Sequence, residues 1–255
     1  MKFSDLLNVP FRLFGVKLVR LATLEKMGQY TTDLSKDIRR DAAFMHLFAK
    51  VEPYTMAGLE RSYSLYKALQ FLHQNNIKGD LVECGVWRGG SCMLMAYFFK
   101  SVGETSRRIY LYDTFEGMAQ PGEADGEREK QEWERLRLNE QTSSWCLSPL
   151  EDVKENMQKT GYPIEHVVYI KGKVEETLPG TIPQEIALLR LDTDWYTSTL
   201  HELKHLFPLL VQKGILLIDD YGVWQGAQKA TDEYFENKPL FLQRIDNSGR
   251  LVIKC

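Results

Sequence analysis

The sequence Leu81-Val82-Glu83-Cys84-Gly85-Val86-Trp87-Arg88-Gly89-Gly90-Ser91 joins a short apolar run to a glycine-containing turn. A run of this length suits a strand buried on both faces, and glycine lets the backbone of the turn approach a ligand closely. Ser91 stands where a helix would begin, and the free N–H groups of a helix N-terminus attract anions. The bulky Trp87 occupies the place of the second glycine of a dinucleotide-binding loop, so NAD is disfavoured and a smaller adenosyl ligand remains compatible.

The pattern of apolar residues changes near Gly79. Before this point they recur at three- and four-residue steps, as in the stretch 59–72, which is typical of helices. After it, short apolar runs alternate with stretches long enough for helices, at 109–112, 167–170, 186–189 and 215–218. We therefore predict a helical extension over 1–78 and an α/β domain over 79–255 with a doubly wound, mostly parallel sheet.

Two segments depart from this alternation. Apolar runs at 240–242 and 251–253 flank Asn247-Ser248-Gly249, which predicts a C-terminal antiparallel hairpin. The stretch 116–140 holds eight acidic and four basic side chains, too polar for a core and long for a connection. We predict a lid-like insertion over about 116–146, although a merely solvated excursion fits the same composition.

The composition excludes several classes of protein. The 255 residues carry 32 basic and 35 acidic side chains, so no excess of positive charge is available to neutralise nucleic-acid phosphates. No run approaches the roughly 18 apolar residues of a membrane span. The first apolar stretch is broken by Pro10 and Arg12, which argues against a signal peptide. Four cysteines without a CxxC pair fit a reducing compartment, and we expect a cytoplasmic protein.

The first twenty residues mix Arg12, Lys17 and Arg20 with apolar neighbours. A helix packed on the body or on a partner subunit is favoured over a weak membrane-surface anchor. Because symmetric dimers are the commonest soluble oligomers, we expect a homodimer or a higher homo-oligomer.

Asp113 ends the run 109–112, about one βα unit after the glycine loop. An acidic side chain at this point can accept both ribose hydroxyls of an adenosyl group. The same side chain could instead cap the turn formed by residues 114–117. Combined with Glu83 and the glycine loop, ribose binding is the favoured interpretation.

Two predicted strands deliver carboxylates to one edge of the sheet. Asp192 and Asp194 follow one run, and Asp219 and Asp220 follow the next. Like charges there repel unless a cation, a proton or an arginine offsets them. We predict Mg²⁺ bound by Asp192, Asp219 and Asp220, because this ion takes hard oxygen ligands, although each aspartate alone would suit a helix cap. A bound cation would stabilise an alkoxide, and a carboxylate beside it could take the proton.

Five ordered motifs then resemble one known family. They are Tyr54-Thr55-Met56 with Arg61, the stretch 82–91, Tyr112-Asp113-Thr114-Phe115-Glu116-Gly117-Met118, the stretch 191–199 with Asp192-Thr193-Asp194-Trp195, and Ile218-Asp219-Asp220-Tyr221-Gly222. Together they resemble the macrocin O-methyltransferase family, which includes sugar O-methyltransferases of antibiotic biosynthesis. The resemblance covers most of the chain from about residue 52 to 235.

The resemblance implies a class I methyltransferase (Rossmann-like) fold that uses S-adenosylmethionine and Mg²⁺. Asp192 is then expected to act as general base as well as metal ligand, with Asp219 and Asp220 completing the metal site. The cofactor-binding residues that it implies are Met56, Glu83, Gly85, Ser91 and Asp113, with Thr114 and Phe115 beside the last.

We therefore expect an S-adenosylmethionine-dependent, Mg²⁺-dependent O-methyltransferase that acts on a hydroxyl of a sugar-bearing small molecule. A catechol-type methyltransferase would share the sheet and the metal but take a planar aromatic diol. A non-catalytic adenosyl-binding protein of the same fold is a third reading, and it would not require the three metal-site aspartates.

Overall fold

The computed structural model describes residues 35–140, 142–238 and 240–255. The structure divides into two compact units between Ala42 and Ala43. The helix α4 (Lys36–Arg40) lies in the first unit, and α5 (Ala42–Val51) begins at the boundary. The amphipathic segment predicted for the first twenty residues lies outside the described residues, and the predicted division at residue 78 stays a prediction.

Seven strands form one sheet in the order β3-β2-β1-β4-β5-β7-β6. The first five are parallel to one another, and β7 is antiparallel to β5. This confirms the predicted α/β sheet. The strands are β1 (Asp80–Cys84), β2 (Ile109–Asp113), β3 (Val167–Lys171), β4 (Ile186–Leu191), β5 (Leu210–Ile218), β6 (Gln243–Arg244) and β7 (Arg250–Ile253).

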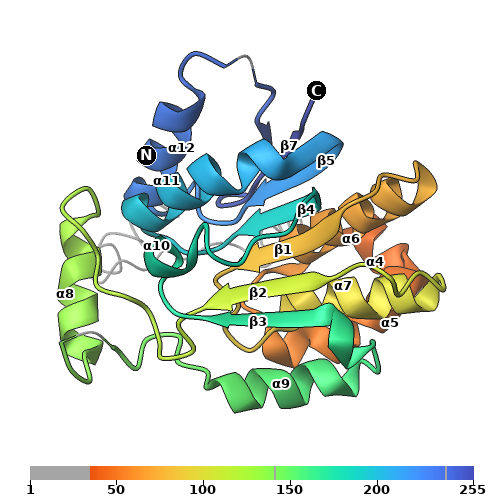
Figure 1. Ribbon diagram of the computed structural model, residues 1–255, viewed down its shortest axis with the longest axis horizontal. Coiled ribbons are helices and arrows are strands. Elements are labelled where there is room, and N and C mark those ends of the chain that lie inside the picture. Colours follow the sequence, from red (N-terminus) through yellow and green to blue (C-terminus); the bar gives the residue numbers. More distant parts are fainter. Residues whose placement is uncertain (1–34, 141, 239) are drawn as a thin grey trace, which may run out of the picture. The chain divides into compact units, whose positions relative to one another are not determined.

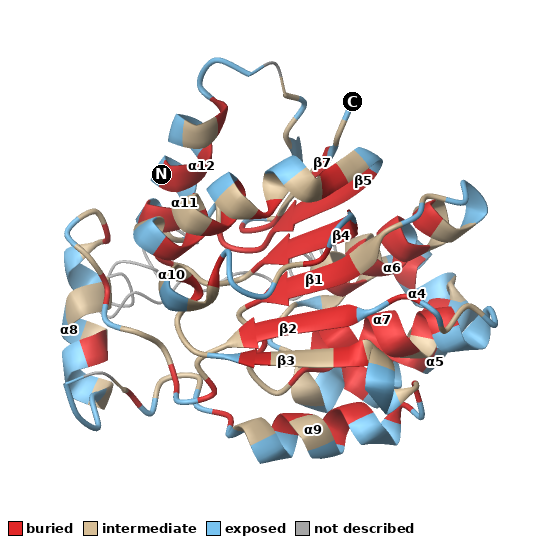
Figure 2. Cartoon of the chain, in the orientation of Figure 1, coloured by how far each residue is buried: buried red, intermediate tan, exposed pale blue. Residues whose placement is uncertain are grey.

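The central strands are apolar because both faces of the sheet are covered. All six residues of β4 are buried, and Figure 2 shows buried strands between helices whose outer surfaces are exposed. The helices α6, α7 and α9 pack in series on one side, and α10, α11 and α12 on the other (Figure 1). Their bounds are α6 (Leu59–Gln74), α7 (Gly90–Ser101), α9 (Leu150–Lys159), α10 (Val174–Thr177), α11 (Tyr196–His205) and α12 (Gln225–Phe235).

The predicted C-terminal hairpin is present, but its first strand is shorter and later than the apolar run suggests. β6 holds two residues and pairs antiparallel with β7. The turn between them is closed by the N–H of Ile245, which donates to the carbonyl of Gly249, and by Asp246 Oδ1, which accepts from Ser248 and Gly249. Phe241 in the predicted run is 81% exposed, so apolar character there does not reflect a strand.

The polar insertion is built around α8 (Glu127–Leu136). Trp133 on this helix is 1% exposed, and its indole N–H donates to the carbonyl of Met118 at 2.9 Å. Arg137 and Ser143 pair as an isolated antiparallel bridge after the helix. The insertion therefore has a buried anchor and backbone pairing of its own. Among the described helices, none combines the length and the apolar character needed to cross a membrane.

The strand order fixes where a ligand can bind. The chain passes from β1 outward to β3 and then returns to β4 on the other side of β1. In open α/β sheets the crevice at such a reversal, beyond the carboxyl ends of the strands, is the place for ligands. The glycine loop, Asp113 and the aspartate pairs all follow the strands at this edge.

Candidate active site

A cavity of about 360 Å³ lies at the carboxyl ends of the strands. Its walls include Gly85 after β1, Asp113 at the end of β2, Asp192 after β4 and Asp219 after β5. Segments far apart in the sequence therefore meet at one site, as the strand order requires.

Gly85 is needed for the contact between β1 and β4. Its φ is +79°, and a Cβ at this position would overlap the carbonyl oxygen of Asp192. The N–H of Asp192 also donates to the carbonyl of Cys84 at 2.8 Å. The absence of a side chain at Gly85 thus lets the loop pack against Asp192, and Gly85 also lines the cavity.

Four of the seven predicted cofactor residues line the cavity: Met56, Gly85, Asp113 and Thr114. Glu83, Ser91 and Phe115 are buried and are not part of its wall. The helix α7 begins at Gly90, one residue before the predicted start, and a Cβ on Gly90 would overlap the backbone of Tyr54. The N-terminus of α7 is therefore packed against the Tyr54-Thr55-Met56 motif.

Asp113 links the glycine loop to the turn after β2 through hydrogen bonds. Its Oδ2 accepts the N–H groups of Val86 at 2.6 Å and Trp87 at 3.1 Å. Its Oδ1 accepts the N–H of Phe115 at 2.7 Å, which is the local capping contact considered from the sequence. Burial raises the pKa of Asp113, and these backbone donors oppose the rise. The carboxylate therefore orders both segments while facing the cavity.

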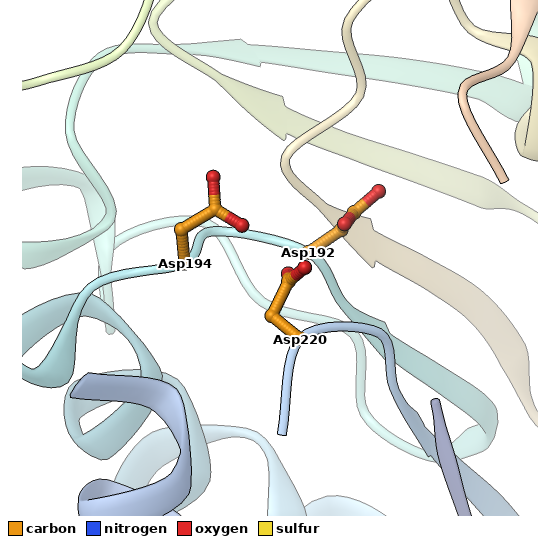
Figure 3. A group of neighbouring side chains, drawn as sticks. All are labelled: Asp192, Asp194 and Asp220. Carbon is orange, nitrogen blue, oxygen red and sulfur yellow. The ribbon is translucent and has the colours of Figure 1, made fainter. Parts of the chain in front are cut away.

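Three carboxylates converge beside this loop. One oxygen each from Asp192, Asp194 and Asp220 lies within 4.8 Å of the others. Figure 3 shows the first two on the segment that follows β4 and Asp220 on the neighbouring segment after β5. Asp194 has a φ of +66° in a tight turn, in which the N–H of Trp195 donates to the carbonyl of Thr193 at 2.7 Å.

Asp219, which the sequence predicted as a metal ligand, has a different environment. Its Oδ1 accepts from Nη2 of Arg190 at 2.5 Å, and its Oδ2 is bonded to Nη1 of Arg61. Arg61 Nε also lies 3.2 Å from Asp246 Oδ2 in the β6–β7 turn. The carboxylate of Asp219 thus links α6 to β4, and Arg61 extends the link to the hairpin.

Arg190 is the residue that the sequence analysis missed. Its Nη1 donates to Glu83 Oε1 at 2.5 Å and to Asp192 Oδ2 at 2.6 Å, and the side chain is 4% exposed. A single arginine within the apolar run of β4 was the available signal, because a buried guanidinium requires carboxylate partners. Glu83, within the apolar run of β1, is that partner.

The acidic and basic side chains in and around this group of carboxylates do not balance in charge. Five carboxylates (Glu83, Asp192, Asp194, Asp219 and Asp220) face the two guanidinium groups of Arg61 and Arg190. Among the described residues, Asp194 and Asp220 form no ion pair with an arginine or lysine, and Asp220 Oδ2 is buried without a hydrogen-bond partner. Burial raises the pKa of Asp194 to about 7, and burial together with Asp194 and Asp192 raises the pKa of Asp220. The group fits a bound cation.

Three tryptophans line the same cavity. Trp195 follows Asp194, Trp224 precedes α12, and Trp145 comes from the insertion. Their ring centroids lie 5.8–5.9 Å apart in pairs. The insertion is tied to this end of the cavity by Asp125, whose Oδ1 accepts the N–H of Tyr196 at 2.9 Å.

The known proteins to which this chain is similar are O-methyltransferases. A 4'-O-methyltransferase of Streptomyces olivaceus, 8-demethyl-8-(2,3-dimethoxy-alpha-L-rhamnosyl)-tetracenomycin-C 4'-O-methyltransferase, is 38% identical over 71% of this chain and 67% of its own length. Demethyldecarbamoylnovobiocin O-methyltransferase of Streptomyces niveus is 33% identical over 71% of this chain and 67% of its own length. The solved structure of the O-methyltransferase NovP is similar with a TM-score of 0.71 and 29% identity, over 79% of this chain and 82% of that one.

A family model matches most of the chain. The model described as Macrocin-O-methyltransferase (TylF) matches residues 14–252, which include β1 to β6, most of β7, the glycine loop and both aspartate pairs. The chain therefore belongs to the macrocin O-methyltransferase family of enzymes, and membership implies S-adenosylmethionine as the methyl donor.

Proposed function

We propose that this enzyme methylates a hydroxyl group of a sugar-bearing small molecule and that a divalent cation, Mg²⁺ by preference, occupies the carboxylate cluster. The observation that carries the proposal is the convergence of Asp192, Asp194 and Asp220 within 4.8 Å in the cavity that Gly85 and Asp113 also line. The sugar-bearing acceptor is supported by the relative named for a rhamnosyl-bearing substrate.

The cofactor end of the cavity is assigned to Gly85, Asp113 and Thr114. The carboxylate of Asp113 accepts three backbone N–H groups, which leaves about one of its roughly four lone-pair sites for a ribose hydroxyl. S-adenosylmethionine supplies an electrophilic methyl group on a positively charged sulfonium. Met56 and Trp87 provide apolar surface at the same cavity.

The cation would be held by Asp192, Asp194 and Asp220, whose oxygens are the hard ligands that Mg²⁺ prefers. When bound, Mg²⁺ supplies Lewis acidity that lowers the pKa of a hydroxyl group. Asp219 as a further ligand stays a prediction from the sequence. Both of its oxygens already accept hydrogen bonds from guanidinium groups, so we leave it out of the proposed set.

Asp192 is proposed as the general base that takes the proton of the acceptor hydroxyl. Arg190 donates to Oδ2 of Asp192 and fixes the orientation of the carboxylate. The other oxygen, Oδ1, is then available for the proton. Alignment of the acceptor oxygen with the methyl group supplies the rest of the rate acceleration.

Calorimetric titration with S-adenosylhomocysteine tests the cofactor assignment. We expect Asp113→Ala to weaken binding by at least about tenfold, equivalent to about 1.4 kcal/mol, and Glu116→Gln to leave it unchanged. Glu116 is an exposed neighbour on the same turn and serves as the matched control. Undiminished binding by Asp113→Ala would refute the ribose assignment.

A further inference from the structure

We infer that Trp145 and Trp224, supported by the buried Trp195, form the acceptor subsite, where they pack against the C–H surface of a saturated sugar ring and so determine acceptor specificity. The inference rests on the proposed function, and it adds the residues that recognise the acceptor and the shape of ring that they select.

The first observation is the arrangement of the three rings. Each pair of rings is edge-to-face, with interplanar angles of 72°, 64° and 77°. No two of the three are parallel, so they form no slot that would grip a flat ring between two faces. They form instead a corner of edges and faces, which suits a puckered ring that presents C–H groups in several directions.

The second observation is the link between two of the rings and the carboxylate cluster. Trp195 directly follows Asp194 in the tight turn after β4. The N–H of Trp224 donates to the carbonyl of Asp220 at 2.9 Å, which fixes the start of α12 beside that aspartate. A ring held by these tryptophans would therefore have its hydroxyl groups within the part of the cavity that contains the proposed base and cation.

The third observation concerns the ring that the insertion contributes. The carbonyl of Trp145 accepts the N–H of Met118 at 2.9 Å, and the indole N–H of Trp195 donates to the carbonyl of Ala119 at 2.8 Å. Met118 and Ala119, which are adjacent in the sequence and line the cavity, thus hold Trp145 and Trp195 in place. The polar insertion is in this way part of the subsite.

Comparison with Trp133 distinguishes a subsite from ordinary core packing. Trp133 is 1% exposed, its indole N–H is satisfied by Met118, and it does not line the cavity. Trp145 and Trp224 are only half-buried, line the cavity, and donate no indole hydrogen bond to any residue of the described chain. Their exposed ring surfaces and N–H groups are available to a ligand, whereas Trp195 is 4% exposed, its indole N–H is satisfied by Ala119, and it packs against both other rings.

The chemistry of the site favours a sugar. The electron-rich face of an indole attracts the weakly positive C–H bonds of a saturated ring. The carboxylates of Asp194 and Asp220 accept hydrogen bonds from hydroxyl groups at the ring edge. Vicinal hydroxyls on a ring that also has an apolar face are typical of a pyranoside, and especially of a 6-deoxyhexoside.

Two vicinal diols serve as matched probes: methyl α-L-rhamnopyranoside, which is saturated, and catechol, which is planar. Methyl transfer from S-adenosylmethionine in the presence of Mg²⁺ is measured by mass spectrometry at low probe concentration, which gives kcat/KM. S-adenosylhomocysteine affinity is measured in parallel by calorimetry. The variants are Trp145→Ala, Trp224→Ala and Trp224→Phe, with Leu138→Ala as the control, because Leu138 lies in the same insertion, is 60% exposed and does not line the cavity.

We expect each alanine variant to lower kcat/KM for the rhamnoside by about tenfold, chiefly through KM, because a stacked aromatic ring contributes about that much to affinity. Trp224→Phe should restore part of the loss, and S-adenosylhomocysteine affinity should change by less than about twofold. Leu138→Ala should leave kcat/KM unchanged.

Three results would overturn the inference while S-adenosylhomocysteine still binds: unchanged kcat/KM in both alanine variants, methylation of catechol but not of the rhamnoside, or methylation of neither probe. Absence of S-adenosylhomocysteine binding to the wild-type chain would instead refute the proposed function on which the inference rests.

Discussion

Arg190 on β4 and Glu83 on β1 are direct partners in the register of the sheet, and Nη1 of the arginine lies 2.5 Å from Oε1 of the glutamate. Both residues are almost fully buried, at 3% and 1% exposed. The same guanidinium group reaches Asp192 and Asp219, so one arginine orients carboxylates from three neighbouring strand ends. The proposed base, Asp192, is therefore positioned by a buried side chain of β4.

Replacing Arg190 by Met should destabilise the fold by about 3–5 kcal/mol, because it leaves buried carboxylates without their counter-charge. Urea unfolding measures this loss. The double variant Arg190→Met with Glu83→Gln should recover part of it, since the amide removes one of the unpaired charges. A loss below about 1 kcal/mol for the single variant would show that the ion pairs are not structurally important.

Replacing Gly85 by Ala should be much more harmful than replacing Gly103 by Ala. Both glycines have positive φ, +79° and +74°, so the backbone cost of about 1–2 kcal/mol is shared. A Cβ on Gly85 would overlap the carbonyl of Asp192, whereas nothing lies within 4 Å of one on Gly103. The difference in unfolding free energy between the two variants measures the close contact of β1 and β4, and equal losses would contradict it.

Glu202 on α11 predicts a specific pH dependence of stability. It is 0% exposed, its Oε2 accepts from Thr193 Oγ1 at 3.1 Å, and burial raises its pKa well above 4.5. The folded state therefore holds a proton that the unfolded state releases. The stability that this provides is fully present below about pH 4.5 and is lost as pH rises towards the pKa of the folded state, by at most about 1.4 kcal/mol per pH unit.

Glu202→Gln should remove this slope, because the amide is neutral at every pH. Urea unfolding between about pH 5 and pH 8 would show the wild-type chain losing stability relative to the variant. The exposed Glu236→Gln variant should keep the wild-type slope. Parallel pH profiles for the wild type and Glu202→Gln would refute a buried, protonated Glu202.

Much of the fold could be predicted from the sequence, because strands buried on both faces leave continuous apolar runs. All five predicted parallel strands are present, and the glycine loop follows β1 as expected. The hairpin strand was misplaced because Leu240 and Leu242 only partly pack against the core and Phe241 is exposed.

The site was harder to predict, because side-chain partners depend on register and on local backbone angles. Arg190 meets Glu83 only because the strands pair in this register. Asp194 joins the cluster through a φ of +66°, which no sequence pattern reveals. Glu83 lies beneath the cavity because its side chain faces Arg190 and Cys92, whose Sγ is 2.7 Å from Oε2. The predicted homo-oligomer and cytoplasmic location stay predictions.

The most direct test of the central claim is a calorimetric titration of Mg²⁺ into the chain saturated with S-adenosylhomocysteine. We expect one cation per chain for the wild type, and a loss of affinity of at least about tenfold for Asp194→Asn and for Asp220→Asn. The Asp219→Asn variant, measured beside them, tests whether that aspartate is also a ligand. Wild-type protein that binds no Mg²⁺, or Asp194→Asn and Asp220→Asn variants that bind it as tightly as the wild type, would contradict the account.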